Sequence, residues 1–199
     1  MYFKIKAAIQ AYKQHSNGYS IDEMKGEKNI NLGCGNRPLT GFVNTDFYNK
    51  KFADEIFDLN LDFPFEESSC DLLYSDNVCE HLHDTVAFIN SCYKCLKPGG
   101  HLVIKVPYFK SKHAFVDPTH FKFFTIQTLD YFVNGKFFNE KYRFTENSFS
   151  SCNIFLDVGS ASYFKHLIAC YAIKRPNRFE NSILSSLFVF HEIVYVLRK

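Results

Sequence analysis

Two glycines at the end of one apolar run and a single acid at the end of the next are the strongest chemical signal in this chain. The first run ends in Gly33 and Gly35, and the second ends in Asp46. Because glycine has no Cβ, its backbone can come within contact distance of a bound ligand. A carboxylate at the tip of the neighbouring strand can accept hydrogen bonds from both hydroxyls of a ribose. The pattern therefore predicts a nucleoside site at two parallel strand tips, with Cys34 and Asn36 beside the glycines.

The spacing of the glycines favours one class of nucleoside cofactor over another. In the G-x-G-x-x-G pattern of dinucleotide-binding folds, the third glycine permits close packing of helix and strand at the pyrophosphate site. Here Pro38 stands at that position. A ligand without pyrophosphate does not need the third glycine. The pattern therefore favours S-adenosylmethionine over NAD, and a dehydrogenase is the weaker alternative.

Four segments of the chain carry a resemblance to a known family. They are LGCGNRP at 32–38 with VNTD at 43–46, DLNLDFPF at 58–65, CDLLYSDNVCEHL at 70–82 and LKPGGHLVIKVP at 96–107. In order and spacing they resemble the class I S-adenosylmethionine-dependent methyltransferases. Within that family the chain is most similar to the small "methyltransferase type 11-like" proteins often found among glycan and cell-surface biosynthesis enzymes. The resemblance covers about residues 28–132.

The resemblance implies an α/β protein with a single Rossmann-like class I methyltransferase domain over residues 1–199. Its sheet would be mostly parallel and twisted, with a C-terminal antiparallel strand. The implied cofactor is S-adenosylmethionine, and the expected reaction is methyl transfer to a hydroxyl of a sugar or other small metabolite in glycan or cell-surface biosynthesis. The alternative is a non-catalytic module that binds S-adenosylmethionine or S-adenosylhomocysteine as an assembly partner. An acceptor side filled by phenylalanine side chains would favour that alternative.

Further cofactor ligands are expected where later strands end. The resembling family places an acid or an amide near the adenine, at the position of Asp58 in this chain. A carboxylate there can accept from the adenine amino group while the backbone N–H of Leu59 reaches a ring nitrogen; otherwise Asp58 is a turn acid. Ser75, Asp76 and Asn77 follow another predicted strand and should line the methionine end of the cofactor, largely through backbone groups.

Asp117 and His120 form the candidate catalytic pair, because they follow the last parallel strand on the side where α/β sheets bind ligands. The resembling family has a similar Asp-Pro-x-His stretch facing the acceptor. Methyl transfer to oxygen releases a proton, and a histidine oriented by a carboxylate is a suitable general base. In the alternative, the two residues only fix the loop through an Asx-Pro turn. His81, in the family's Glu-His-Leu signature, is a second candidate, although there it more often organises the site wall.

No metal site is expected from the sequence. His113, Asp117 and His120 have ligand-like spacing, but no further acid or cysteine completes a set. Cys92 and Cys95 lie inside a predicted helix without a second pair, so packing as small apolar thiols is favoured over zinc or redox chemistry.

A group of aromatic residues follows the family motifs and has two interpretations. The side chains could form an acceptor pocket, or they could belong to the hydrophobic core. Their helical or turn spacing favours the hydrophobic core. The members of the group are Phe121, Phe123, Phe124, Tyr131 and Phe132. A basic stretch at 174–178 indicates either an anionic acceptor or a membrane surface, or simply an exposed turn.

Composition excludes several classes of protein. With 199 residues, 46% of them hydrophobic and 22% charged, the chain fits one ordinary globular domain. A net charge of +2 gives no case for nucleic acid. Lys4 and Lys6 interrupt the N-terminal apolar residues, and no long apolar run follows, so neither a signal peptide nor a transmembrane segment is expected. We therefore expect a cytoplasmic location, a small-molecule or glycan acceptor, at most peripheral membrane contact, and seven cysteines present as thiols.

The elements that must position these residues follow from periodicity and capping. Residues 28–107 should form the cofactor-binding core, 108–190 the acceptor-side segment and 191–197 the last strand. The predicted strands are 28–32, 42–46, one ending near 57–58, 71–75, 101–106, 141–149 and 191–197. Helices are predicted at the N-terminus (1–16) and from the Asp84 cap to Pro98. Residues 33–41 are too few for the helical crossover of about 10–12 residues, so a turn, or one short coil of helix around 36–40, should join the first two strands.

Overall fold

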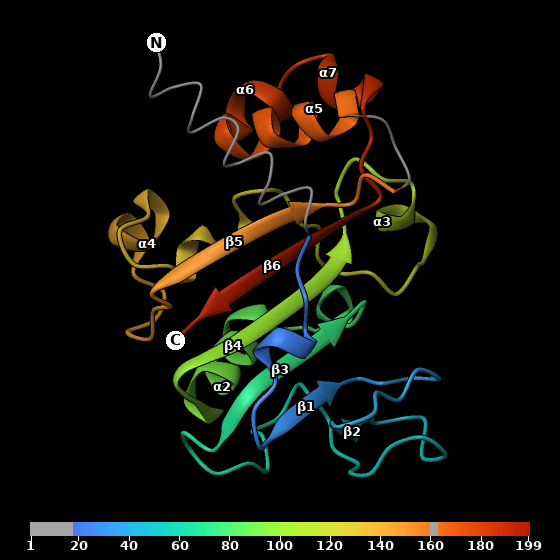
Figure 1. The fold of residues 1–199 in the computed structure, drawn as a ribbon, viewed down its shortest axis with the longest axis vertical. Helices are drawn as coiled ribbons and strands as arrows, with labels where there is room; N and C mark the ends of the chain where they lie inside the picture. The colour runs from blue at the N-terminus through green and yellow to red at the C-terminus, as the bar shows by residue number, and fades with distance from the viewer. Residues whose placement is uncertain (1–17, 160–162) are drawn as a thin grey trace.

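The computed structural model describes residues 18–159 and 163–199 and contains one mixed sheet with strand order β2-β1-β3-β4-β6-β5 (Figure 1). The strands are β1 (Asn29–Leu32), β2 (Val43–Thr45), β3 (Cys70–Asp76), β4 (Leu96–Pro107), β5 (Ser151–Leu156) and β6 (Glu192–Arg198). The pairs β1–β2, β1–β3 and β3–β4 are parallel, whereas β6 is antiparallel to both β4 and β5. The predicted mostly parallel α/β sheet with an antiparallel C-terminal strand is confirmed.

The described chain also contains two longer helices and several short ones. The longer ones are α2 (Thr85–Cys95) and α5 (Tyr163–Lys174). The short ones are η1 (Asp22–Met24), η2 (Cys79–His81), α3 (His113–Val116), η3 (Thr128–Phe132), α4 (Phe137–Tyr142), α6 (Pro176–Glu180) and α7 (Leu184–Leu187). The Asp84 side chain accepts a hydrogen bond from the N–H of Ala87, which confirms it as the N-cap of α2. None of the described helices is long and apolar enough to cross a bilayer.

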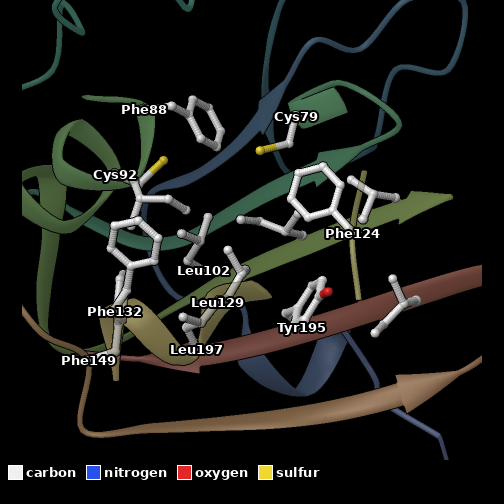
Figure 2. Close-up of a cluster of buried hydrophobic side chains, with 14 of the residues drawn as sticks. Cys79, Phe88, Cys92, Leu102, Phe124, Leu129, Phe132, Phe149, Tyr195 and Leu197 are labelled. Carbon is white, nitrogen blue, oxygen red and sulfur yellow. The ribbon is translucent and has the colours of Figure 1, made fainter. Parts of the chain in front are cut away.

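The main hydrophobic core fills the space between the sheet and α2. Figure 2 shows side chains from α2, η2, η3 and the strands pointing toward one another. Those labelled are Cys79, Phe88, Cys92, Leu102, Phe124, Leu129, Phe132, Phe149, Tyr195 and Leu197. A smaller cluster of buried apolar residues packs separately and includes Leu72 and Val103, which alternate along their strands with the main-core residues Leu73 and Leu102. The central strands are therefore buried on both faces, as parallel strands usually are.

The junction of α2 with β4 differs from the prediction. The helix ends at Cys95 and β4 begins at the next residue, rather than after Pro98. The register between β3 and β4 shifts between the pairs Cys70–Leu96 and Leu72–His101. This irregularity lets the Pro-Gly-Gly segment stay within the strand.

Two predicted strands are wrong. Near 57–58 the sheet gains only an isolated bridge between Thr45 and Glu55, because the Phe57 ring packs on Phe63 and Phe65 at 5.5 and 5.6 Å. At 141–149 the alternating aromatic residues do not form a β-strand, because their rings stack on another aromatic ring. Tyr142 and Phe144 lie 5.6 and 5.1 Å from the Tyr131 ring, measured between centroids. The strand that pairs with β6 begins only after this segment, at the start of β5.

Three further expectations concern the joint between β1 and β2, the cysteines and the N-terminal helix. The joint between β1 and β2 is a turn without a helix, as predicted. All seven cysteines are free thiols. The predicted N-terminal helix falls on residues 1–17, outside the described part of the chain.

The turn after β1 depends on a glycine with no room for a side chain. Gly33 has φ +71°, and a Cβ built on it would lie 2.5 Å from Cγ2 of Val78. Gly35 has φ +54°, but a Cβ there would meet no atom within 4 Å. The N–H of Cys34, between them, donates to the carbonyl of Thr45 at 2.8 Å and joins the turn to β2. Gly33 is therefore required by both backbone conformation and packing.

We expect Gly33→Ala to lower the free energy of unfolding by about 2–4 kcal/mol, the sum of left-handed strain and overpacking. Gly35→Ala is the matched control, with a cost of about 1 kcal/mol from conformation alone. Urea denaturation of the two variants measures the difference. Adding Val78→Ala to the Gly33→Ala background should recover part of the loss. Equal costs for the two glycine variants would contradict the role given to Val78.

Candidate functional site

A cavity of about 660 Å³ lies at the carboxyl ends of β1, β2 and β3. Figure 1 shows why a site forms there: the arrowheads of β1, β3 and β4 point to the same edge of the sheet. Seven of the predicted site residues line this cavity: Gly33, Gly35, Asp46, Asp58, Leu59, Asn77 and His81. The strand-tip glycines and acids, separate in sequence, therefore face one space.

Asp46 ties the glycine turn to the tip of β2. Its Oδ2 accepts from the N–H of Gly35 at 2.8 Å, and its Oδ1 accepts from the N–H groups of Tyr48 and Asn49 at 2.8 and 2.7 Å. Two carboxylate oxygens offer about four lone-pair positions, so capacity remains for a ligand hydroxyl. Asp46 thus shapes the loop and presents an acceptor to the cavity.

Four predicted cofactor residues are not among the described lining residues. Cys34 is buried with its Sγ 3.7 Å from the carbonyl oxygen of Phe52, and burial raises the pKa of its thiol. Asn36 is exposed and its Oδ1 accepts from the Asn49 amide at 2.6 Å. Ser75 is fully buried in β3.

Asp76 is not among the residues that line the cavity, and it contacts charged and polar groups. Its carboxylate is 3.2 Å from Arg37 and 3.6 Å from Lys105, and it accepts from the Asn77 amide at 2.9 Å. Asn77 has φ +55°, a left-handed conformation that asparagine tolerates better than most residues. Asp76 therefore acts on the cavity through Asn77.

Residues that sequence reasoning did not select also line this cavity. They are Phe47, Tyr48, Asn60, Val78, Leu82, His83 and Thr119. Most follow a selected residue directly in sequence, so the signal available was their place in the loops after the strands. Thr119 lies directly before the selected His120, and Phe121, a member of the aromatic group considered for the acceptor pocket, lines the cavity as well.

A second cavity, of about 550 Å³, adjoins the first, since Asn77 and His81 line both. Asp117 and His120 also line it, so all three predicted catalytic residues lie together. Glu80 is a further lining residue that was not selected, although it precedes His81 in the family signature. The two cavities give room for two ligands in contact at one boundary.

The predicted orientation of His120 by Asp117 is wrong in this geometry. Nδ1 of His120 lies 3.1 Å from the carbonyl oxygen of Ala114, which can only accept. Asp117 instead accepts from the N–H and hydroxyl of Thr119 at 2.8 and 2.7 Å, and these bonds lower the pKa of the Asp117 carboxyl. Oγ1 of Thr119 is in turn 2.9 Å from Nδ1 of His81. Asp117 therefore supports His81, through Thr119.

The carboxylate that faces His120 belongs to Glu80. Its Oε1 lies 4.0 Å from Nε2 of His120, and the rings of His81 and His120 are 4.6 Å apart between centroids. Glu80 is only 1% exposed, and burial raises the pKa of its carboxyl to about 7. The fold brings together a buried acid and two histidines at the boundary of the cavities.

The aromatic group divides between the two interpretations given above. Phe124 and Phe132 are buried in the core (Figure 2). Phe121 and Phe123 are half exposed, and Phe121 reaches the first cavity. All five residues of the group, Tyr131 included, also line a separate cavity of about 310 Å³.

Comparisons with known proteins agree with this architecture. Residues 57–104 match a family model described as "Methyltransferase domain". No curated protein matches the chain. Among solved structures, the chain is similar to a SAM-dependent methyltransferase from Archaeoglobus fulgidus, with TM-score 0.55, 19% identity and coverage of 98% of this chain and 93% of that one.

Two further structures share the fold at low identity. A putative methyltransferase from Haloferax volcanii, in complex with the Trm112 methyltransferase activator, has TM-score 0.53, 14% identity and coverage of 96% and 88%. Phosphoethanolamine N-methyltransferase 2 from Haemonchus contortus, in complex with S-adenosyl-L-methionine, has TM-score 0.52, 13% identity and coverage of 98% of this chain and 52% of that one. Strand order, strand-tip cavity and these similarities lead to one conclusion: the chain has the Rossmann-like fold of the class I S-adenosylmethionine-dependent methyltransferases.

Proposed function

We propose that this protein transfers a methyl group from S-adenosylmethionine to a small-molecule acceptor. The observation that carries the proposal is the pair of adjoining cavities, which meet at Asn77 and His81. The cofactor occupies the cavity at the glycine turn, and the acceptor occupies the cavity at His120. The methyltransferase domain match at 57–104 supports the same reaction.

The cofactor contacts follow from the groups that line the first cavity. Asp46 accepts from a ribose hydroxyl with the remaining lone pair of Oδ2. Asp58 accepts from the adenine amino group, and its Oδ1 already accepts from the N–H and amide of Asn60, both at 2.9 Å. The N–H of Leu59 reaches an adenine ring nitrogen, and Asn77 borders the methionine end, where the two cavities meet.

The acceptor we propose is a hydroxyl of a sugar or other small metabolite used in glycan or cell-surface biosynthesis, methylated in the cytoplasm. The sulfonium is an activated donor, so alignment and exclusion of water supply much of the rate. The remaining need is removal of the hydroxyl proton. The Nδ1–H of His120 is engaged by Ala114, which leaves Nε2 to accept that proton, with the resulting imidazolium facing Glu80.

A non-catalytic binding module is less well supported. That alternative expects the acceptor side to be filled by phenylalanine side chains. The second cavity is open and is lined by polar groups, among them four histidines: His81, His113, His120 and His191. An open polar cavity beside the cofactor favours the enzyme.

Replacing Asp46 tests the cofactor site. We expect Asp46→Ala to weaken S-adenosylhomocysteine binding by about 1.5–3 kcal/mol, because a charge-assisted ribose hydrogen bond is lost. Isothermal titration calorimetry gives the affinity, and circular dichroism verifies the fold. Asp62→Ala, an exposed acid outside the cavity, is the control and should bind normally. Unchanged affinity in Asp46→Ala would remove Asp46 from the site.

Replacing His120 tests the chemistry. His120→Ala should keep cofactor affinity within about twofold and lower turnover by about 10²–10⁴, the usual contribution of a positioned base. Transfer of labelled methyl groups to a panel of hydroxylated sugars and small metabolites identifies an acceptor and measures turnover. His101→Gln, on β4 away from both cavities, should retain activity. Loss of cofactor binding in His120→Ala would instead support a structural role for this loop.

A further inference from the structure

Glu80, His81 and His120 form a cluster whose ligand atoms converge. Each offers one nitrogen or carboxylate oxygen, and these atoms lie within 4.8 Å of one another. All three residues line the acceptor cavity. The set differs from the histidines and acid at 113–120 whose spacing was considered above, because it combines two distant segments.

The hydrogen bonds of His120 determine which nitrogen is free. The carbonyl of Ala114 can only accept, so Nδ1 of His120 carries the proton at that contact. In the neutral ring Nε2 then has a lone pair, and it faces Oε1 of Glu80 at 4.0 Å. Two acceptors face each other there, and a cation or a proton between them removes the repulsion.

The partners of His81 fix its ring in the same way. The Thr119 hydroxyl donates to the Asp117 carboxylate at 2.7 Å, so its oxygen can only accept from Nδ1 of His81 at 2.9 Å. The Thr119 carbonyl lies 3.3 Å from the same nitrogen. Nε2 of His81 is therefore the lone-pair nitrogen. Metal-binding histidines commonly donate their other N–H to a carbonyl or an acid-linked group in this manner.

The third member is an unpartnered buried acid. Glu80 is 1% exposed, and neither carboxylate oxygen has a hydrogen-bond partner among the described residues. A buried carboxylate is costly unless it is paired, hydrogen-bonded or bound to a metal. This group points to a ligand that the protein chain does not itself supply.

We propose that Glu80, His81 and His120 bind one divalent transition-metal ion at the boundary of the two cavities. Two imidazole nitrogens and one carboxylate are a set typical of such ions, and three ligands leave coordination positions open. Because all three residues line the acceptor cavity, the open positions face the acceptor. Binding of the ion does not depend on the proposed function.

The role of the ion rests on the proposed function and refines it. An acceptor hydroxyl bound to the ion has a lowered pKa, so its O–H bond breaks and the proton passes to solvent. The oxyanion then bonds to the methyl carbon as the carbon–sulfur bond breaks, and the electron pair stays on sulfur to give S-adenosylhomocysteine. In the metal-bound protein His120 is a ligand, and in the metal-free protein it remains the proton acceptor.

Cobalt titration tests the site without any acceptor. The full chain, first treated with a chelator, is titrated with Co²⁺ and followed by visible absorption and calorimetry. We expect one equivalent to bind, with ligand-field bands in the visible region, and Zn²⁺ to displace it. Glu80→Gln, His81→Ala and His120→Ala should each weaken Co²⁺ binding by about 100-fold or more. His113→Ala, a histidine of the same cavity outside the cluster, should bind Co²⁺ as the wild type does.

Four results would overturn the proposal. They are no stoichiometric binding, equal affinity in all variants, loss of binding in His113→Ala, and a strong near-ultraviolet charge-transfer band, which indicates thiolate ligands. Circular dichroism and S-adenosylhomocysteine affinity verify each fold, and if Glu80→Gln does not fold, the partly exposed His81 provides the test through His81→Ala. S-adenosylhomocysteine binding without metal binding refutes this inference alone, whereas metal binding without cofactor binding refutes only the proposed function.

Discussion

Parallel pairing of β3 with both β1 and β4 is the constraint on which the rest of this structure depends. It aligns Leu32 with Ser75 and Asp76 with Lys105, so three strands end at the same edge of the sheet. Parallel strands need both faces covered, and α2 and the apolar residues beneath it meet that need on one face. With the strand ends fixed together (Figure 1), the loops that follow them leave from one edge of the sheet. The two cavities are lined by residues of these loops.

Two of the carboxylates at this edge of the sheet accept most of their hydrogen bonds from the protein itself. Asp46 accepts three backbone N–H bonds, and Asp117 accepts two bonds from Thr119. These bonds fix the loops that carry the two acids. They therefore hold the free lone pair of Asp46 in place, and they hold the His81 ring in place through Thr119. Glu80 is different, because its carboxylate has no hydrogen bond among the described residues. That contrast separates acids that build the site from one that is available for chemistry.

The short helix η2 explains how core and site are joined. Cys79 is fully buried in the main core, its neighbour Glu80 is buried and lines the second cavity, and His81 is partly exposed and lines both cavities. The Glu80 carbonyl also accepts from the N–H groups of Phe121 and Lys122 at 2.8 and 3.2 Å. Those bonds attach the segment after His120 to η2. The two histidines are therefore held close by backbone pairing as well as by their own contacts.

Local patterns in the sequence were enough for the strand tips, the turn after β1, the cap of α2 and the position of the last strand, whereas the antiparallel direction of that strand was expected from the family resemblance. Each depends on residues near one another in the chain, through side-chain periodicity, capping or the conformation of glycine. Placing the glycines and Asp46 around one space required only that neighbouring parallel strands end together. The strand expected at 141–149 was wrong because its alternating aromatic residues stack on Tyr131, from a separate segment.

Only the tertiary structure decided which side chains are partners within the site. From spacing, Asp117 was the natural companion of His120. Asp117 instead bonds Thr119, two residues on, as the Asx-turn alternative expects, and packing of this loop against η2 brings Glu80 to His120. The Glu80–His120 contact depends on how segments distant in sequence pack together, and no local periodicity encodes it. The sequence by itself determined where a ligand site would form, and the tertiary contacts decided which groups in it can act.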